Sequence, residues 1–106
     1  MASHFEVVAN RDGRQQVLAV SGELDLAAAS SLEVAIDAAL ATDVDKIVVD
    51  LAQLEFVDST GLSVLVSGHQ RAQESGRVLG VLNATAQVER LLDLTGLGER
   101  LALPDA

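Results

Sequence analysis

The feature that most constrains the fold is an uninterrupted β-branched run in the middle of the chain, within residues 45–51 (DKIVVDL). Ile47, Val48 and Val49 follow one another, a pattern typical of a strand that is buried on both faces. Segments with helical spacing of apolar residues lie before and after this strand. Because a helical crossover between neighbouring strands favours parallel pairing and right-handed connections, the sequence predicts an α/β domain.

A hairpin is predicted ahead of this strand. Residues 5–9 (FEVVA) and 15–20 (QQVLAV) are strand-like, and Asp12-Gly13 between them is a strong signal for a tight turn. We expect the second of these strands to break at Gly22. Since the two strands of a hairpin run antiparallel, the predicted sheet is mixed.

Three segments have the apolar spacing of helices: 26–41, 59–75 and 86–95. Residue types that cap helices mark their ends, with Asp25 and Thr85 as expected N-caps and Gly76 and Gly96 as expected terminators. Glycine is suited to the terminating position because it adopts the left-handed conformation there at little cost.

The rest of the chain completes the predicted topology. We expect a loop at 52–58 (AQLEFVD), another buried strand at 77–83 (RVLGVLN) and a last short strand at 101–104 (LALP). The fold class is therefore a small mixed β-sheet, an N-terminal hairpin plus parallel β-α-β units, backed by helices. No repeat, linker or low-complexity tract divides the chain, so residues 1–106 are expected to form a single domain.

Composition argues against several classes of function. The formal net charge is −9, and such a surface repels nucleic acid and anionic lipid, although it would suit a partner with a basic face. The chain has no cysteine, which rules out disulfides and thiolate metal sites. No apolar stretch approaches the roughly 18 residues of a membrane span, and the N-terminus lacks a signal-peptide pattern. We expect a cytoplasmic protein without a nucleic-acid or membrane partner.

The sequence lacks the residue patterns that a serine enzyme or a metal site requires. A nucleophilic Ser59 requires a base, but His69 lies about 15 Å along the same predicted helix at 1.5 Å per residue, and His4 is near the terminus. Val57 occupies the position at which a nucleophile elbow has glycine. Metal-ligand spacings are absent, so we expect no catalytic residue, no metal and no cofactor.

Asp50 ends the buried strand, the position at which a response-regulator receiver carries its phosphorylated aspartate. Such a receiver also needs an acidic pair after its first strand and a lysine after its last, whereas Lys46, the only lysine, precedes Asp50 on the same strand. We favour the structural alternative, in which Asp50 turns the chain out of the sheet.

Residues 57–66 (VDSTGLSVLV) place a polar cluster at the start of the second predicted helix. Either Asp58 or Ser59 can cap this helix, and if Asp58 does so, the Ser59 hydroxyl is left free at the first helical position. At about 100° per residue, Leu62 and Val66 fall on the side of Ser59, away from the main core stripe. They either fill the side of the core or form a second apolar stripe that begins at Ser59.

The chain resembles the STAS-domain anti-anti-sigma factors, which are bacterial antagonists of anti-sigma factor kinases. The resemblance rests mainly on residues 20–33 (VSGELDLAAASSLE) and 48–66 (VVDLAQLEFVDSTGLSVLV), with support from 91–97 (LLDLTGL). A D-S-T-G motif alone is weak, but its combination with G-E-L-D and a late L-x-G-L at these separations is strong. The family fold, a small mixed sheet backed by helices, agrees with the predicted order of elements.

The resemblance implies a phosphorylation switch at Ser59. In this family the partner, an anti-sigma factor serine kinase, phosphorylates the serine that follows the aspartate of D-S-T-G. The unmodified antagonist binds the kinase and frees the sigma factor, and the phosphorylated form is released until a phosphatase restores it. Asp25 resembles the family residue that supports recognition or phosphorylation. With the resemblance, Leu62 and Val66 are interpreted as the rim of a partner-binding surface, which comprises Gly22, Glu23, Leu24, Asp25, Asp58, Ser59, Thr60, Gly61, Leu62, Ser63 and Val66.

Two alternatives within the family stay open. One is a scaffold or sensor-complex STAS protein that binds partners without a switch at Ser59. The other is a nucleotide-binding STAS domain, which would hold phosphate through backbone N–H groups alone because no basic residue lies near the D-S-T-G loop before Arg71. A small hydrolase is disfavoured for want of a base.

Overall fold

The N-terminal hairpin forms as predicted. In the computed structural model, which describes residues 4–103, β1 (Phe5–Asp12) pairs antiparallel along its whole length with residues 15–22 of β2 (Gln15–Leu24). Gly13 in the connecting turn has φ +63°, the left-handed conformation that tight hairpin turns require. The hairpin therefore begins the sheet as an antiparallel pair.

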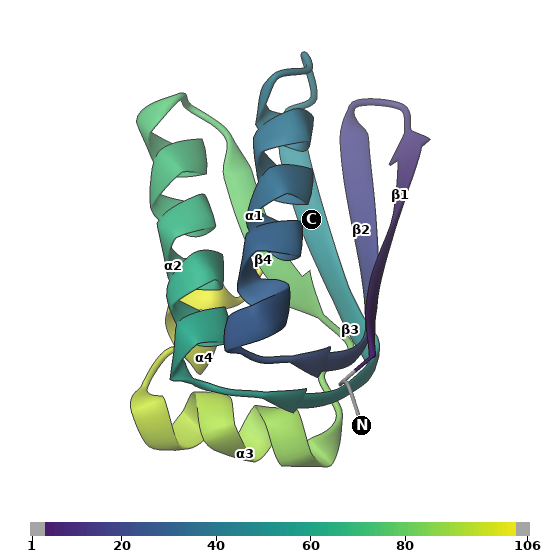
Figure 1. Ribbon diagram of the computed structural model, residues 1–106. Helices are drawn as coiled ribbons and strands as arrows, with labels where there is room; N and C mark the ends of the chain where they lie inside the picture. Colours follow the sequence, from purple (N-terminus) through teal and green to yellow (C-terminus); the bar gives the residue numbers. More distant parts are fainter. Residues whose placement is uncertain (1–3, 104–106) are drawn as a thin grey trace.

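The remaining strands make the sheet mixed. β3 (Lys46–Val57) pairs parallel with β2, and β4 (Val78–Leu82) pairs parallel with β3, in the order β1-β2-β3-β4. The crossovers are α1 (Leu26–Leu40) and α2 (Ser59–Glu74), which lie side by side over the same face of the sheet (Figure 1). This confirms the predicted fold class.

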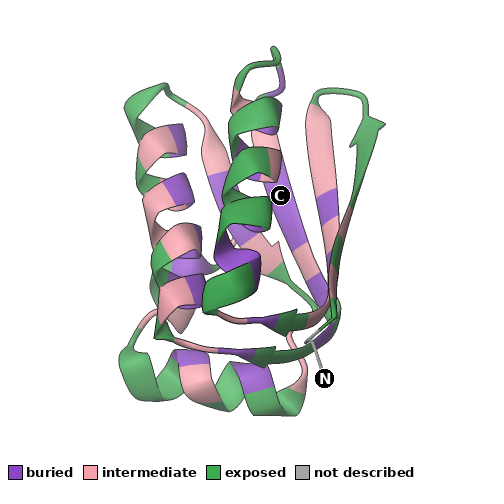
Figure 2. Cartoon of the chain, viewed as in Figure 1, coloured by how far each residue is buried: buried purple, intermediate pink, exposed green. Residues whose placement is uncertain are grey.

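The core lies between that sheet face and the two helices. Leu18, Ile47, Val49 and Leu79 of the strands are all fully buried. The helices present their buried sides to the sheet and their exposed sides to solvent (Figure 2). Gly68 brings α2 close to its neighbours, since a Cβ atom there would lie 3.2 Å from the side chains of both Ile36 and Leu79.

Two strands are longer than predicted. β2 does not break at Gly22 but continues to Leu24, with an irregular register between Gly22 and Glu23. Residues 52–58 are not a loop, because β3 continues to Val57 alongside β2. The buried positions in Ala52–Val57 recur every third residue and do not alternate, so the sequence of this bent strand lacks the usual strand pattern.

Asp50 marks the point at which β3 leaves β4. The pairing of β3 with β4 ends at Asp50 opposite Leu82, while its pairing with β2 goes on. The Asp50 carboxylate accepts hydrogen bonds from the Ala52 N–H (3.0 Å) and the Asn83 side-chain amide (3.3 Å). Asp50 therefore has a structural role at this bend, although the chain stays within the sheet.

The C-terminal part adds two helices and not a strand. α3 (Ala86–Thr95) lies across one end of the sheet, and α4 (Gly98–Leu101) follows it (Figure 1). Of the predicted strand at 101–104, the described residues form only a single parallel bridge between Ala102 and Val81. This bridge and a 2.8 Å contact between His69 Nδ1 and the Leu79 carbonyl oxygen cover part of the outer edge of β4. None of the described helices is long and apolar enough to cross a membrane.

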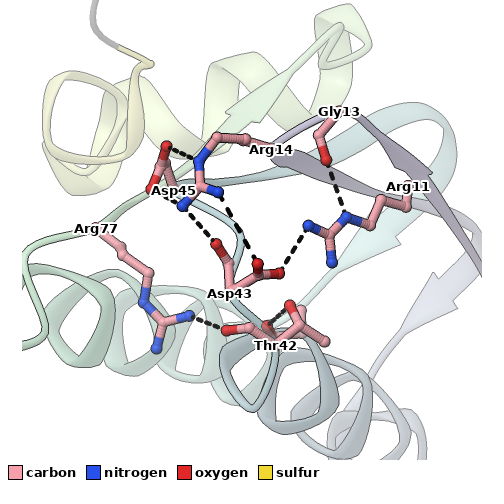
Figure 3. A network of polar contacts seen from close by, with 8 residues as sticks. Arg11, Gly13, Arg14, Thr42, Asp43, Asp45 and Arg77 are labelled. Atoms are coloured by element: carbon pink, nitrogen blue, oxygen red, sulfur yellow. Dashed lines mark hydrogen bonds and ion pairs between the residues drawn. The ribbon is translucent and has the colours of Figure 1, made fainter.

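Three loops at one end of the sheet are joined by arginine contacts (Figure 3). Arg11 pairs with Asp43 (2.7 Å) and Arg14 with Asp45 (2.6 Å), which connects the β1–β2 turn to the loop before β3. Arg77, which precedes β4, donates to the carbonyl oxygens of residues 40 and 42. We call this region the paired end of the molecule.

Candidate functional site

The N-termini of α1 and α2 lie next to each other at the opposite end of the sheet, which we call the site end (Figure 1). Each helix starts directly after a strand, and the last residues of these strands, Leu24 and Val57, are paired in the sheet. The Asp58 N–H also donates to the Leu24 carbonyl oxygen (3.2 Å). The two helix entrances are therefore fixed to each other by the backbone.

An aspartate caps each of these helices. An Asp25 carboxylate oxygen accepts a hydrogen bond from the Ala28 N–H, and an Asp58 oxygen accepts one from the Gly61 N–H, both at 3.0 Å. Such caps satisfy N–H groups that have no partner within the helix. The prediction of Asp25 as N-cap is confirmed, and of the two candidates for α2 it is Asp58 that caps.

Ser59 is consequently the first residue of α2 and not its cap. Its side chain is exposed, and its hydroxyl makes no hydrogen bond to any of the residues that the structure describes. The hydroxyl of Ser63, one turn further along, donates instead to the Ser59 carbonyl oxygen (2.9 Å). Of these two exposed serines, Ser59 has the hydroxyl that is available to a reagent in solvent.

Gly61 sets the position of this helix entrance. A Cβ atom at Gly61 would lie 2.6 Å from Leu24 Cγ, 2.8 Å from the Leu24 carbonyl oxygen and 2.9 Å from Val57 Cγ2. Real Cβ atoms do not approach other atoms so closely, so only glycine lets α2 approach the strand ends in this way. The glycine of D-S-T-G thus positions the helix that carries Ser59.

The structure corrects part of the expected binding surface. Leu62 is only 5% exposed and belongs to the core, and Val66 is half-buried against it, so these residues do not form an exposed stripe. Both side chains pack into the hydrophobic core, and α2 contacts α1, α4 and β4. Leu24 and Gly61 are buried too.

The other predicted residues remain at the surface to different degrees. Glu23, Ser59 and Ser63 are exposed, whereas Gly22, Asp25, Asp58, Thr60 and Val66 are half-buried.

Sequence reasoning missed an apolar pocket at the same end. It has a volume of about 230 Å³ and is lined by Phe56, Val57, Val88, Leu91 and Leu94, together with Gln87 and Arg90. Phe56 is 43% and Leu94 78% exposed. The exposed Leu26, at the start of α1, adds a further apolar side chain at this end. Only the path of α3 across the end of the sheet brings these residues together.

The charges of the site end are mostly negative. Glu23 and Glu55 are exposed, and neither has an ion-pair partner within the described part of the chain. Arg90, which the sequence analysis did not associate with this region, lines the apolar pocket. Among the described residues, no group of three or more His, Asp or Glu side chains is placed to hold a metal ion.

Comparison with known proteins places this geometry in a family. The family described as "Mlab, STAS domain" matches residues 7–104. The chain is 33% identical over 87 residues to the anti-sigma-F factor antagonist RsfB of Mycobacterium tuberculosis, which covers 82% of this chain and 70% of RsfB. The chain therefore belongs to the STAS-domain anti-sigma factor antagonist family, whose members are non-enzymatic regulators.

Solved structures agree with this assignment. An anti-sigma factor antagonist from Mycobacterium paratuberculosis superposes with a TM-score of 0.84 at 29% identity, covering 97% of this chain and 87% of the other. SpoIIAA in its unphosphorylated form gives a TM-score of 0.75 at 26% identity, covering 95% of this chain and 89% of that protein.

Proposed function

We propose that this chain binds an anti-sigma factor kinase while Ser59 is unmodified, and that phosphorylation of Ser59 releases it. Binding would free a sigma factor for transcription in the cytoplasm, and a phosphatase that acts on phosphorylated Ser59 would restore the antagonist. The observation that carries the proposal is that Asp58 caps α2, which leaves the adjacent Ser59 hydroxyl exposed and without a hydrogen bond to the described residues. The relationship to anti-sigma factor antagonists, one of them solved in an unphosphorylated form, supports it.

The docking surface differs from the one expected from the sequence. Since Leu62 is buried, the exposed apolar contacts at the site end would come from Leu26, Phe56 and Leu94. Apolar side chains surrounded by polar groups are typical of protein interfaces. The unpaired carboxylates of Glu23 and Glu55 would suit a partner with a basic face.

Phosphate would act through this surface and not through the fold. A phosphoserine carries about −1.5 to −2 charges at pH 7. At a helix N-terminus the dipole favours such a charge by roughly 0.3–2 kcal/mol, and the Asp58 carboxylate opposes it. These small terms compare with a total stability of about 5–15 kcal/mol. In a complex, by contrast, a dianion on Ser59 that faces an acidic or apolar part of the partner, away from the basic part that Glu23 and Glu55 would contact, costs several kcal/mol, and each 1.4 kcal/mol lowers the affinity tenfold.

Binding of two Ser59 variants tests the proposed switch. We expect Ser59→Ala to bind the anti-sigma factor as tightly as the wild type, and Ser59→Asp to bind at least tenfold more weakly, as measured by calorimetry. Gln73→Glu, which adds one negative charge near the other end of α2, serves as the matched control and should bind normally. Equal affinities of the wild type and Ser59→Asp would count against the proposal.

Phosphorylation can be tested directly. After incubation of the wild type with the kinase and Mg-ATP, mass spectrometry should locate one phosphate, on Ser59. Modification of Thr60 or Ser63 alone would refute the assignment of the site. Tight binding without any phosphorylation would instead indicate a non-switching scaffold.

A further inference from the structure

β3 has an unpaired edge next to the site. Its first half lies between β2 and β4, but β4 ends opposite Asp50, and residues 53–57 pair with β2 only. Figure 1 shows this last part of β3 curving beneath α1 and α2, with α3 below it. Within residues 4–103, the side of β3 that faces away from β2 therefore has no neighbouring strand at 53–57.

A groove follows this free edge. It is open to solvent, has a volume of about 710 Å³, and is lined by residues 52–56 of β3, residues 85–87 at the start of α3, and Glu23. The volume falls within the range of roughly 300–1,000 Å³ that is usual for binding clefts. Phe56 and Gln87 line both this groove and the apolar pocket, so the two are adjacent.

The groove is negatively charged. Among the described residues that line it, Glu23 and Glu55 are charged, Gln53, Thr85 and Gln87 are polar and neutral, and none is Lys or Arg. Neither carboxylate has an ion-pair partner among the described residues. An unpaired strand edge binds extended peptides through main-chain hydrogen bonds, and neighbouring side chains select the sequence. Two free carboxylates select lysine and arginine.

From this juxtaposition we infer that the groove binds an extended, basic segment of the anti-sigma factor, which adds as a strand to residues 53–56 of β3. The inference rests on the proposed function, because it takes the anti-sigma factor as the partner. It assigns to the complex a second contact beside Ser59. The bound segment would lie between β3 and the start of α3.

Hydrogen exchange and charge reversal test the inference together. With the purified anti-sigma factor that the wild type captures, amide exchange measured by NMR should slow at least tenfold within residues 53–56. Glu55→Lys should weaken binding at least tenfold. Glu74→Lys, an equal charge change at the exposed C-terminal end of α2, should change it less than twofold.

The outcomes separate this inference from the proposed switch. Wild-type affinity of Glu55→Lys with unchanged exchange at 53–56 would overturn the groove as a binding site, even where Ser59→Asp fails to bind. Loss of binding by Glu55→Lys together with normal binding by Ser59→Asp would uphold the groove and refute the switch. Slow exchange at 53–56 that appears in the chain alone at high concentration would assign the edge to a second copy and overturn the inference. Failure of the wild type to bind any anti-sigma factor would overturn both.

Discussion

At the paired end both carboxylates of the loop before β3 face a guanidinium, whereas at the site end Glu23 and Glu55 are exposed and have no such partner among the described residues. The apolar side chains differ in the same way, since Phe56 and Leu94 are exposed at the site end. Polar groups within a fold are usually hydrogen-bonded, whereas exposed apolar side chains that cluster at one place mark sites of interaction. The contrast indicates that the paired end holds loops together and that the site end is available for binding.

Glycine substitutions at the two ends of the molecule should give the largest difference in the free energy of unfolding. A Cβ atom at Gly22 would lie 1.8 Å from the His4 carbonyl oxygen, and φ there is +91°. We expect Gly22→Ala to lower the free energy of unfolding by roughly 2–5 kcal/mol, through backbone strain and displacement of β1. Gly13→Ala at the paired end, where a Cβ atom would meet no described atom within 4 Å beyond the adjacent residues, should cost only about 1–2 kcal/mol. Urea denaturation measures both, and equal losses would contradict this account.

A smaller loss of stability is expected from glycine substitutions in α2, where Gly61 lies at the start of the helix and Gly68 in its middle. Gly61→Ala places a Cβ atom 2.8 Å from the Leu24 carbonyl oxygen, and such overpacking costs roughly 1–3 kcal/mol, against up to about 1 kcal/mol that Ala gains in a helix. Gly68→Ala meets only side-chain atoms at 3.2 Å, so we expect it to be closer to neutral. Thermal unfolding compares the two, and a more stable Gly61→Ala would show that the entrance of α2 is not fixed by contact with Leu24.

Removal of the ion pairs of the paired end should change the stability least, because all their charged groups are exposed. Hydrogen bonding to Arg11 lowers the pKa of Asp43, and hydrogen bonding to Arg14 lowers the pKa of Asp45, both from the ordinary value of 3.8. The stabilisation is therefore complete above about pH 4 and is lost as the pH falls through the lowered pKa values. The same hydrogen bond to Asp45 raises the pKa of Arg14, so this arginine stays charged over the whole pH range in which the aspartates titrate.

Urea midpoints at pH 7 and pH 3 check this dependence. The double variant Asp43→Asn/Asp45→Asn should lose less stability on acidification than the wild type. Asp12→Asn, an exposed aspartate near the same turn without an ion-pair partner in the described chain, should behave as the wild type does. A double variant with the same pH dependence as the wild type would mean that these pairs contribute nothing to stability.

Local signals in the sequence predicted most of the elements correctly. Asp25 and Thr85 cap α1 and α3, and Gly96 ends α3 in the left-handed conformation, as expected. Capping depends on a few neighbouring residues, which explains why it can be inferred without the rest of the fold. The mixed sheet followed from the order of the elements and from the handedness of crossovers.

The features that the sequence did not predict depend on contacts between distant parts of the chain. The second half of β3 exists because β2 pairs with it, and a strand with one free edge and a bend does not alternate in polarity. Helical counting left open whether Leu62 fills the side of the core, and the resemblance placed it on the rim of the binding surface, whereas the structure buries it in the core. The place of Arg90 and Leu94 beside Phe56 follows from the path of α3 and has no local signature.

The close seat of Gly61 against Leu24, with the hydrogen bond from Asp58 to Leu24, leaves the corner that carries Ser59 little freedom to move. A group attached to that serine would therefore change the local charge and volume of the surface, while the backbone conformation stays the same. Any protein that distinguishes the two forms must touch this corner directly, since a binder on the opposite side of the molecule would meet the same surface in both.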